Sequence, residues 1–179
     1  LFLVASLLLA PSVLRADDQA KGLTIAQEQK ARDRGWGDSE SELQMVLRNA
    51  QGRESARRMR TFALEVQGDG DKALTIFDEP LDVRGSAFLT HSHPTAEDDQ
   101  WLYLPSVRRT RRIASRNKSG PFMASEFAYE DMTSFELEKF SFRYLRDEVC
   151  GEQCTVSLAK RKTEPFAQRV TVPQSRRVC

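Results

Sequence analysis

The pattern of hydrophobic and polar residues changes along the chain from a helical period to an alternating one. Two capping-box sequences, Thr24-x-x-Gln27 and Ser39-x-x-Glu42, are typical of helix starts. Gly35 and Gly52 stand where such helices would end. The second expected helix has apolar residues at the spacing of one helix face: Leu43, Val46, Leu47 and Ala50. The pattern therefore predicts two helices at the start of the chain.

From residue 57 onward the period is two. Phe62, Leu64 and Val66 alternate with polar residues, and a turn sequence at 68–71 precedes a partner strand at 72–77. Further strands are expected at 83–91, 100–104, 110–115, 140–144 and 155–160. Short connections between successive strands favour an antiparallel meander. We therefore predict an α+β fold in which two N-terminal helices pack against one strongly curved antiparallel sheet.

The first sixteen residues have the character of a secretory signal peptide. An uncharged apolar run, Leu1–Ala10, is followed by small residues up to Ala16. The run is shorter than the roughly 20 apolar residues that a membrane span requires. We interpret residues 1–16 as a signal peptide with an incomplete start, and residues 17–179 as a single domain. The alternative is a buried N-terminal strand or helix.

Export permits disulfide bonds. Cys150 and Cys154 flank a short loop between two expected strands, so they could form a cross-strand disulfide or remain two thiols. Cys179 is left without a partner by this pairing.

The charges of the chain are balanced except in one stretch. The formal net charge of the 179 residues is +1, which gives no reason to expect nucleic acid as a partner. The basic stretch comprises Arg108, Arg109, Arg111, Arg112, Arg116 and Lys118. It could bind an anionic phosphate, or it could be a solvated edge strand whose charges prevent aggregation.

The sequence offers little that indicates catalysis. His91-x-His93, followed by Asp98 and Asp99, could hold a zinc ion, although a solvated strand end explains the same residues. Neither histidine belongs to a recognisable nucleophile motif, and the sequence has no glycine-rich phosphate loop. We therefore predict no catalytic residues, no metal and no cofactor.

Aromatic and apolar residues concentrate in the second half of the chain. Most of them must fill a core, yet one sheet covered by two helices has more apolar surface than cover. Surplus concave apolar surface is what a carrier of hydrophobic ligands needs. The residues expected to line such a site are Trp101, Tyr103, Phe122, Met123, Phe127, Phe140, Phe142 and Tyr144.

Several ordered motifs resemble one known family. They are Phe77–Pro80, Val83–Leu89, Asp99–Pro105, Arg111–Ile113 and Phe122–Met132. Together they resemble the LolA-like outer membrane lipoprotein-sorting proteins, of the type associated with MMPL/RND exporters, over residues 35–162.

The resemblance implies a half-open, incomplete β-barrel whose concave face is lidded by the N-terminal helices. It implies a non-enzymatic periplasmic carrier that binds lipid or lipoprotein acyl chains, with an inner-membrane MMPL/RND exporter as a further partner. Two alternatives stay open: an accessory subunit that docks on such an exporter without its own ligand, and a metal-dependent hydrolase using His91, His93 and Asp98.

The sequence departs from the family pattern at four places. Ala124 stands where the family usually has glycine, and Glu126 where it usually has aspartate. Glu79 occupies the nearest equivalent of an arginine that latches the lid in related carriers. Residues 172–179 do not resemble the family, which predicts a carrier domain that is truncated or altered at its C-terminus.

Overall fold

The computed structural model describes residues 12–150, 152–161 and 167–173, with side chains described for residues 16–147. The chain forms two compact units. We call Asp33–Glu136 the sheet unit, and the described parts of Leu1–Arg32 and Leu137–Cys179 the helical unit.

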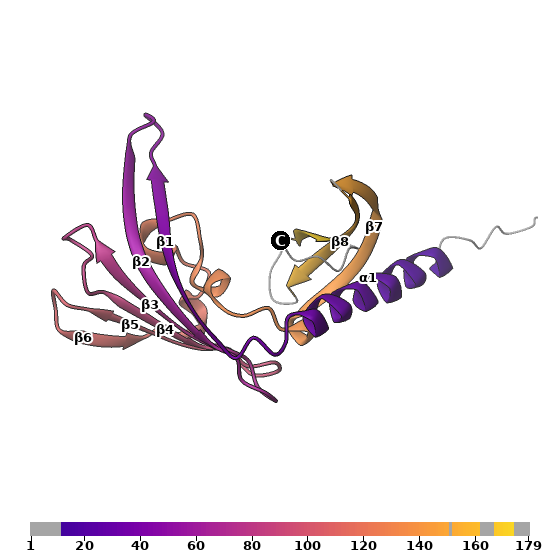
Figure 1. Cartoon of the computed structure of the whole chain (residues 1–179), viewed down its shortest axis with the longest axis horizontal. Helices are drawn as coiled ribbons and strands as arrows, with labels where there is room; N and C mark the ends of the chain where they lie inside the picture. The colour runs from indigo at the N-terminus through magenta and orange to yellow at the C-terminus, as the bar shows by residue number, and fades with distance from the viewer. Residues whose placement is uncertain (1–11, 151, 162–166, 174–179) are drawn as a thin grey trace, which may run out of the picture. The chain divides into compact units, whose positions relative to one another are not determined.

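The sheet unit contains a curved six-stranded antiparallel sheet in which strand order follows chain order (Figure 1). Its strands are β1 (Asp38–Arg48), β2 (Glu54–Leu64), β3 (Lys72–Glu79), β4 (Ala87–His91), β5 (Asp99–Leu104) and β6 (Arg109–Arg112). Every neighbouring pair is antiparallel. The prediction of an antiparallel meander is therefore confirmed, and so is the hairpin around residues 68–71.

The predicted second helix is wrong, because residues 38–48 form β1. This strand pairs with β2 over its whole length, from Asp38 opposite Leu64 to Arg48 opposite Glu54. Leu43, Met45 and Leu47 share one face of this strand, and Val46 is the apolar residue between them on the other face. The apparent capping box at Ser39 lies inside the strand, where hydrogen bonds to β2 occupy the backbone.

Two further strands differ from their expected bounds. β4 begins at Ala87 and not at Val83, because residues 80–86 form a turn in which the amide of Gly85 donates to the carbonyl of Phe77 at 2.7 Å. Gly85 has a φ of 76°, which glycine adopts without strain. β6 ends at Arg112, and Ser115–Asn117 form a 3₁₀ turn, η1.

The six-stranded sheet has two distinct faces. One face, which we call the Phe88 face, carries Phe88 opposite Thr75 and Leu102 in the neighbouring strands. The other, the Trp101 face, carries Trp101 opposite Leu89, which in turn lies opposite Leu74. Side chains of the Phe88 face are the more deeply buried on these strands.

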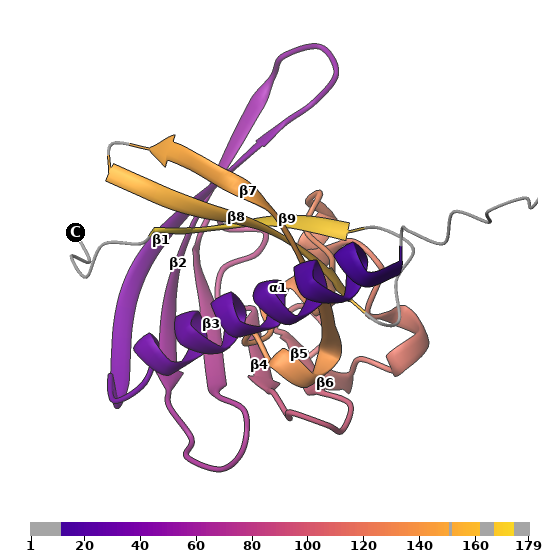
Figure 2. The ribbon, with the colours of Figure 1, turned by 90° about the vertical axis from the view of Figure 1, so that its right-hand side faces the viewer.

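The helical unit consists of helix α1 (Ser12–Arg32) and a three-stranded antiparallel sheet (Figure 2). The strands are β7 (Phe140–Cys150), β8 (Glu152–Arg161) and β9 (Ala167–Pro173). The strands expected at 140–144 and 155–160 are confirmed and are longer than predicted, whereas β9 was not predicted. The chain therefore has two sheets and one long helix among the residues that the structure describes.

The predicted start of the first helix at Thr24 is also wrong. Thr24 lies inside α1, and its hydroxyl donates to the carbonyl of Ala20 at 3.0 Å. Ala16, the end of the predicted signal peptide, lies in α1 as well, while residues 1–11 lie outside the described residues. None of the helices in the described part of the chain combines the length and apolarity that a bilayer crossing requires.

Cys150 and Cys154 lie at the facing ends of β7 and β8. The backbone register places Cys150 opposite Glu152 and Cys154 opposite Glu148, so the two cysteines are not direct cross-strand partners. Their sulfur atoms lie outside the described side chains, and the proposed disulfide stays a prediction.

Helix α1 approaches β7 closely at Gly22. Gly22 is buried, as is Ala26 one turn later, so small residues form the side of the helix that packs. A Cβ atom on Gly22 would lie 2.7 Å from the backbone nitrogen of Tyr144. Lys21, next in sequence, places its Nζ atom 3.5 Å from the centroid of the Tyr144 ring.

We predict that Gly22→Ala has opposite effects on the isolated helix and on the protein. In a peptide of α1, alanine raises helicity, because glycine is about 1 kcal/mol less favourable in a helix. In the full chain, the added methyl meets the β7 backbone and lowers the free energy of unfolding by about 1–3 kcal/mol. Circular dichroism of the peptide and thermal unfolding of the chain measure the two effects. If Gly22→Ala stabilised both the peptide helix and the full chain, the close approach of Gly22 to β7 would be contradicted.

Candidate functional site

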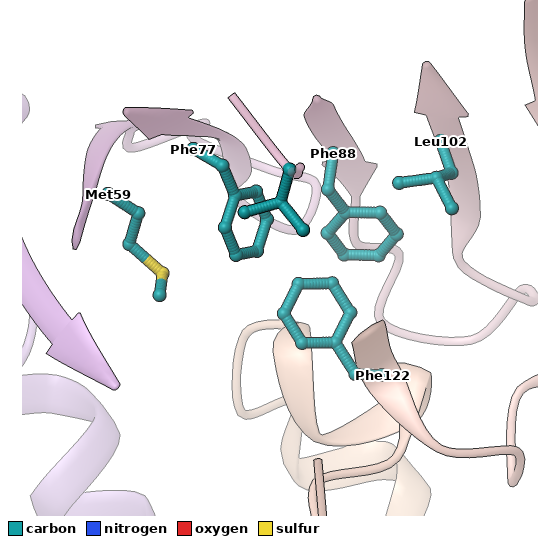
Figure 3. Close-up of a cluster of buried hydrophobic side chains, with 6 residues drawn as sticks. Met59, Phe77, Phe88, Leu102 and Phe122 are labelled. Atoms are coloured by element: carbon teal, nitrogen blue, oxygen red, sulfur yellow. The ribbon is translucent and has the colours of Figure 1, made fainter. Parts of the chain in front are cut away.

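The Phe88 face carries the main hydrophobic core of the sheet unit. Its buried members are Met59, Phe77, Val83, Phe88, Leu102 and Phe122. Five of them come from the sheet and its β3–β4 turn, whereas Phe122 comes from the segment that follows β6. Figure 3 shows the ring of Phe122 facing Phe77 and Phe88 from the opposite side of the core.

We call residues 114–136 the covering segment, because they lie against the Phe88 face. Phe122 is fully buried, and its ring centroid lies 5.0 Å from that of Phe88 and 6.0 Å from that of Phe77. Tyr129 meets Phe122 edge-on at 5.5 Å and lies 5.6 Å from Phe88. Burial raises the pKa of the Tyr129 hydroxyl. Aromatic packing is thus the principal contact between the segment and the sheet.

The covering segment folds as a chain of short turns. It contains two 3₁₀ turns after η1, namely η2 (Phe122–Ala124) and η3 (Tyr129–Met132). The amide of Phe122 donates to the carbonyl of Phe127 at 2.6 Å, and the hydroxyl of Ser125 donates to the carbonyl of Phe122 at 2.7 Å. Met123 and Ala124 have φ values of 49° and 58°, a conformation that favours glycine. The glycine usual in the family at the position of Ala124 fits this geometry.

Polar side chains of the sheet tether the covering segment at two points. Gln100 is fully buried and donates through Nε2 to the carbonyl of Tyr129 at 2.6 Å, while its Oε1 has no hydrogen-bond partner among the residues that the structure describes. Arg57 on β2 donates through Nη1 to the carbonyl of Met123. The sequence did not predict a role for Arg57, because no local feature distinguishes this residue from the adjacent Arg58.

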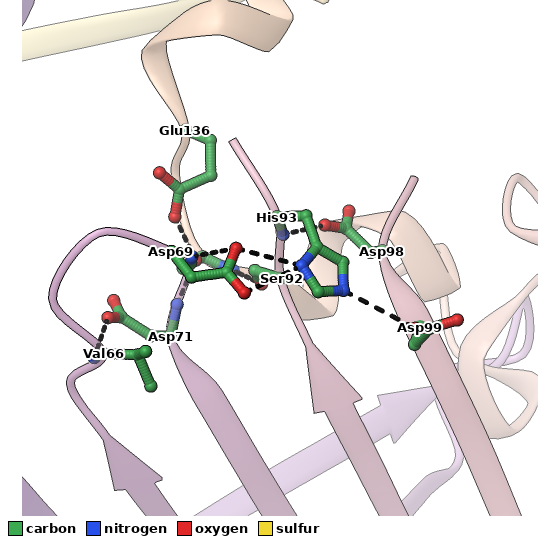
Figure 4. A network of polar contacts seen from close by, with 10 residues as sticks. Val66, Asp69, Asp71, Ser92, His93, Asp98, Asp99 and Glu136 are labelled. Carbon is green, nitrogen blue, oxygen red and sulfur yellow. Dashed lines mark hydrogen bonds and ion pairs between the residues drawn. The ribbon is translucent and has the colours of Figure 1, made fainter. Parts of the chain in front are cut away.

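A polar network ties the end of the covering segment to the sheet (Figure 4). The amide of Ser134 donates to the hydroxyl of buried Ser92 at 2.9 Å, and the hydroxyl of Ser134 donates to Glu136 at 2.6 Å. The amide of Asp71 at the start of β3 lies 3.4 Å from the hydroxyl of Ser134. The contacts fix the point where the segment leaves the sheet unit.

The two histidines of the His91-x-His93 motif have separate environments. His91 packs edge-on against Trp101 at 5.2 Å, and burial lowers its pKa. His93 lies between Asp69, 3.0 Å from Nδ1, and Asp99, 3.5 Å from Nε2 (Figure 4). A backbone hydrogen bond from Gly70, and then the bond to His93, lower the pKa of Asp69. Among the described residues no group of three or more His, Cys, Asp or Glu side chains is arranged so that it could hold a metal ion.

Within the sheet unit, the structure does not bring the predicted lining residues onto one surface. Phe122 lies in the core, with Met123 packed against it, whereas Phe127 is 53% exposed. Trp101 and Tyr103 belong to the Trp101 face, opposite to Phe122. The remaining three lie on β7 of the helical unit: Phe140 and Phe142 are buried, with rings 6.2 Å apart, and Tyr144 is half-buried. Their role in binding a ligand stays a prediction.

An apolar strip on β1 extends the Phe88 face beyond the core. Leu43 lies opposite Met59, and Met45 lies opposite Arg57. Met45 packs against the core, whereas Leu43 is 48% exposed. Leu47, also on this face, is half-buried. We call Leu43, Met45 and Leu47 the β1 strip.

A pocket of about 390 Å³ lies over β1, β2 and β3. Most of its lining is polar or charged: Glu42, Gln44, Arg58, Arg60 and Asp78, with Leu43 and Met59 between them. Arg60 donates to both carboxylate oxygens of Asp78, at 2.9 and 3.0 Å. This bond lowers the pKa of Asp78 and raises that of Arg60. Such a charged lining does not suit an acyl chain.

The fold and the covered apolar face define an α+β protein built on a curved antiparallel sheet, and the comparisons agree with that class. A domain from Vibrio parahaemolyticus assigned as an outer membrane lipoprotein-sorting protein is 55% identical, with a TM-score of 0.82 over 88% of this chain and 68% of that chain. A DUF1329 family protein from Desulfovibrio piger is 24% identical, with a TM-score of 0.79 over 88% of this chain and 69% of that chain.

A LolA superfamily protein from Nitrosomonas europaea shares the fold at 16% identity, with a TM-score of 0.54 over 79% of this chain and 59% of that chain. A family model described as "uncharacterized protein" matches residues 69–173. No curated protein gives a significant match. The chain belongs to the LolA-like outer membrane lipoprotein-sorting protein family.

We predict that Ala124→Gly stabilises the sheet unit. The left-handed conformation costs alanine about 1–2 kcal/mol, and the greater chain entropy of glycine offsets about 0.5–1 kcal/mol of the gain. The expected result is a rise of about 0.5–1 kcal/mol in the free energy of unfolding, measured with denaturant. Ala128→Gly is the matched control, because Ala128 is extended at a φ of −85° and should lose stability. A loss at both positions would contradict the strained conformation of Ala124.

Proposed function

We propose that the protein is a periplasmic carrier that binds an acyl chain of a lipid or lipoprotein on the Phe88 face. In this proposal residues 17–179 are one exported carrier domain, and the sheet acts as a half-open barrel from which cargo passes toward the outer membrane. Family membership supports the general role, since one relative is assigned to outer membrane lipoprotein sorting. The observation that carries the proposal for this chain is the β1 strip.

The β1 strip supplies an apolar surface that continues from the core. Leu43 is about half exposed although it lies opposite Met59, which is only 3% exposed. Burial of each methylene of an acyl chain gains about 0.8 kcal/mol, so a chain laid along this strip would gain stability at every carbon. Met45 of the strip packs against the core. A bound acyl chain could therefore extend from the β1 strip to the edge of the covering segment.

The construction of the covering segment supports a surface that can accept cargo. The segment is held by Phe122 and the side chains packed around it, and by hydrogen bonds with residues that include Gln100, Arg57 and Ser92. Between residues 114 and 136 it contains only short 3₁₀ turns and an isolated bridge between Pro121 and Ala128. Displacing such a segment from the sheet breaks few backbone hydrogen bonds. The segment can therefore move away from the Phe88 face more easily than a paired strand could. We propose that it acts as a lid over the Phe88 face.

We predict that Leu43→Asp weakens acyl binding and that Val46→Asp does not. Both side chains are on β1 and are 48% and 50% exposed, but they point to opposite faces of the sheet. Loss of a leucine contact of about 1.5–3 kcal/mol corresponds to a fall in affinity of at least tenfold. Titration of each variant with a fluorescent long-chain fatty acid measures the affinity.

Comparison of the Leu43→Asp and Val46→Asp variants also identifies the face of the sheet that binds the ligand. If Val46→Asp abolished binding while Leu43→Asp did not, the ligand would lie on the Trp101 face with Trp101 and Tyr103. No binding by the unaltered chain, together with no lipid in an organic extract of freshly purified protein, would reject the carrier function itself.

We predict that Arg57→Met loosens the covering segment and raises acyl affinity. The variant keeps an apolar stem but removes the hydrogen bond to Met123, worth about 1.5–3 kcal/mol for a charged donor. Amide hydrogen exchange should accelerate at Phe122 and Ser125, whose amides are bonded within the segment. Arg58→Met is the control, because Arg58 pairs with Glu79 on the other face. Unchanged exchange and affinity in Arg57→Met would argue against a lid that competes with cargo.

A further inference from the structure

The β6 edge of the six-stranded sheet carries a concentration of arginines, and three of them have no acidic partner among the described residues. β6 is the last strand in the sheet order, and all four of its residues are exposed. Arg109 and Arg111 form no ion pair within the described part of the chain, nor does Arg108 in the preceding turn. By contrast, Arg112 pairs with Asp99, and Arg58 and Arg60 of β2 pair with Glu79 and Asp78.

Arg109 and Arg111 share one face of the edge strand. Arg109 lies opposite Leu104 and Arg111 opposite Leu102, so both side chains lie on the Phe88 face of the edge strand. Alternate residues of a strand are roughly 7 Å apart, a spacing at which two guanidinium groups can each bind a separate phosphate. Val107, in the turn before β6, is 56% exposed and adds an apolar side chain beside this basic group.

Protection of the edge against aggregation does not account for this arrangement by itself. Charges of either sign, paired or unpaired, block pairing of an exposed edge. The opposite edge of the same sheet, β1, begins with acidic residues at Asp38, Glu40 and Glu42. The β6 edge is thus basic where the first residues of β1 are acidic, although β1 itself ends with Arg48 and the net charge of the chain is only +1. A concentrated patch of positive charge orients a protein toward an anionic surface.

We propose that the β6 edge, through Arg108, Arg109 and Arg111 with Val107, docks the protein on an anionic membrane surface. Arginines near such a surface bind lipid phosphates, and the exposed apolar side chain enters the interface. A nucleic acid would use the same charges but would gain nothing from Val107, and a lipid surface is therefore the better fit. This docking does not rest on the acyl site, since the residues of the two surfaces are different.

The test is co-flotation of the full chain with vesicles of zwitterionic phosphatidylcholine, with and without anionic phosphatidylglycerol. We expect binding only to the anionic vesicles. Raising the ionic strength from about 0.1 M to 1 M shortens the Debye length from about 10 Å to about 3 Å and should remove most of the binding. The double variant Arg109→Gln/Arg111→Gln should bind about 30-fold more weakly, at about fivefold for each arginine.

The matched control is Arg48→Gln/Arg58→Gln. It removes the same net charge from arginines that are paired with Glu54 and Glu79, and it should bind within about threefold of the unaltered chain. Arg109→Lys/Arg111→Lys keeps the charge and should retain most of the binding. Equal losses in the control would overturn the proposal, because they would show an effect of bulk charge. Binding to duplex DNA as strong as to anionic vesicles would also overturn it.

Discussion

The sheet unit depends on the burial of one ring, that of Phe122, against the Phe88 face. A sheet of six strands must cover at least one apolar face, and no helix of the sheet unit does so among the described residues. Phe122 contacts Phe77 and Phe88 from a segment that has little regular structure of its own. Tyr129 and the amide of Gln100 complete this attachment. The same contact that stabilises the core therefore determines how firmly the Phe88 face is closed.

Closure by a short segment leaves the Phe88 face unevenly covered, and this unevenness connects the fold to a carrier function. Over β3, β4 and β5 the face is buried, whereas Leu43 on β1 is half exposed. A protein that only needed stability would gain from covering the β1 strip. A carrier instead needs apolar surface that is available to cargo but too small to hold it irreversibly, because each methylene adds only about 0.8 kcal/mol. In the proposed function, the uncovered β1 strip is the surface that receives the acyl chain.

Charged side chains of the sheet unit fall into two groups, those with an oppositely charged partner and those without one among the described residues. On the Trp101 face, Arg60 and Asp78 form a bidentate pair that lowers the pKa of Asp78. His93 lies between Asp69 and Asp99, which contact its two ring nitrogens. Arg109 and Arg111 of β6 are different from Arg112, which pairs with Asp99, because these two form no ion pair in the described part of the chain. Paired charges fix the strands and turns, and unpaired charges remain available to another surface.

The sequence by itself determined the α+β class, the antiparallel meander and the family, because alternating residues and turn sequences are local signals and the motifs from Phe77 to Met132 are ordered along the chain. It could not show that residues 38–48 form a strand, since Leu43 and Leu47 satisfy a helical period as well, and only pairing with β2 decides between the two. Nor could it separate Trp101 from Phe122, because the face on which an aromatic residue lies depends on strand register. The contact of Arg57 with Met123 spans 66 residues of sequence. Tertiary structure alone decided these features, because each arises from partners that are distant along the chain.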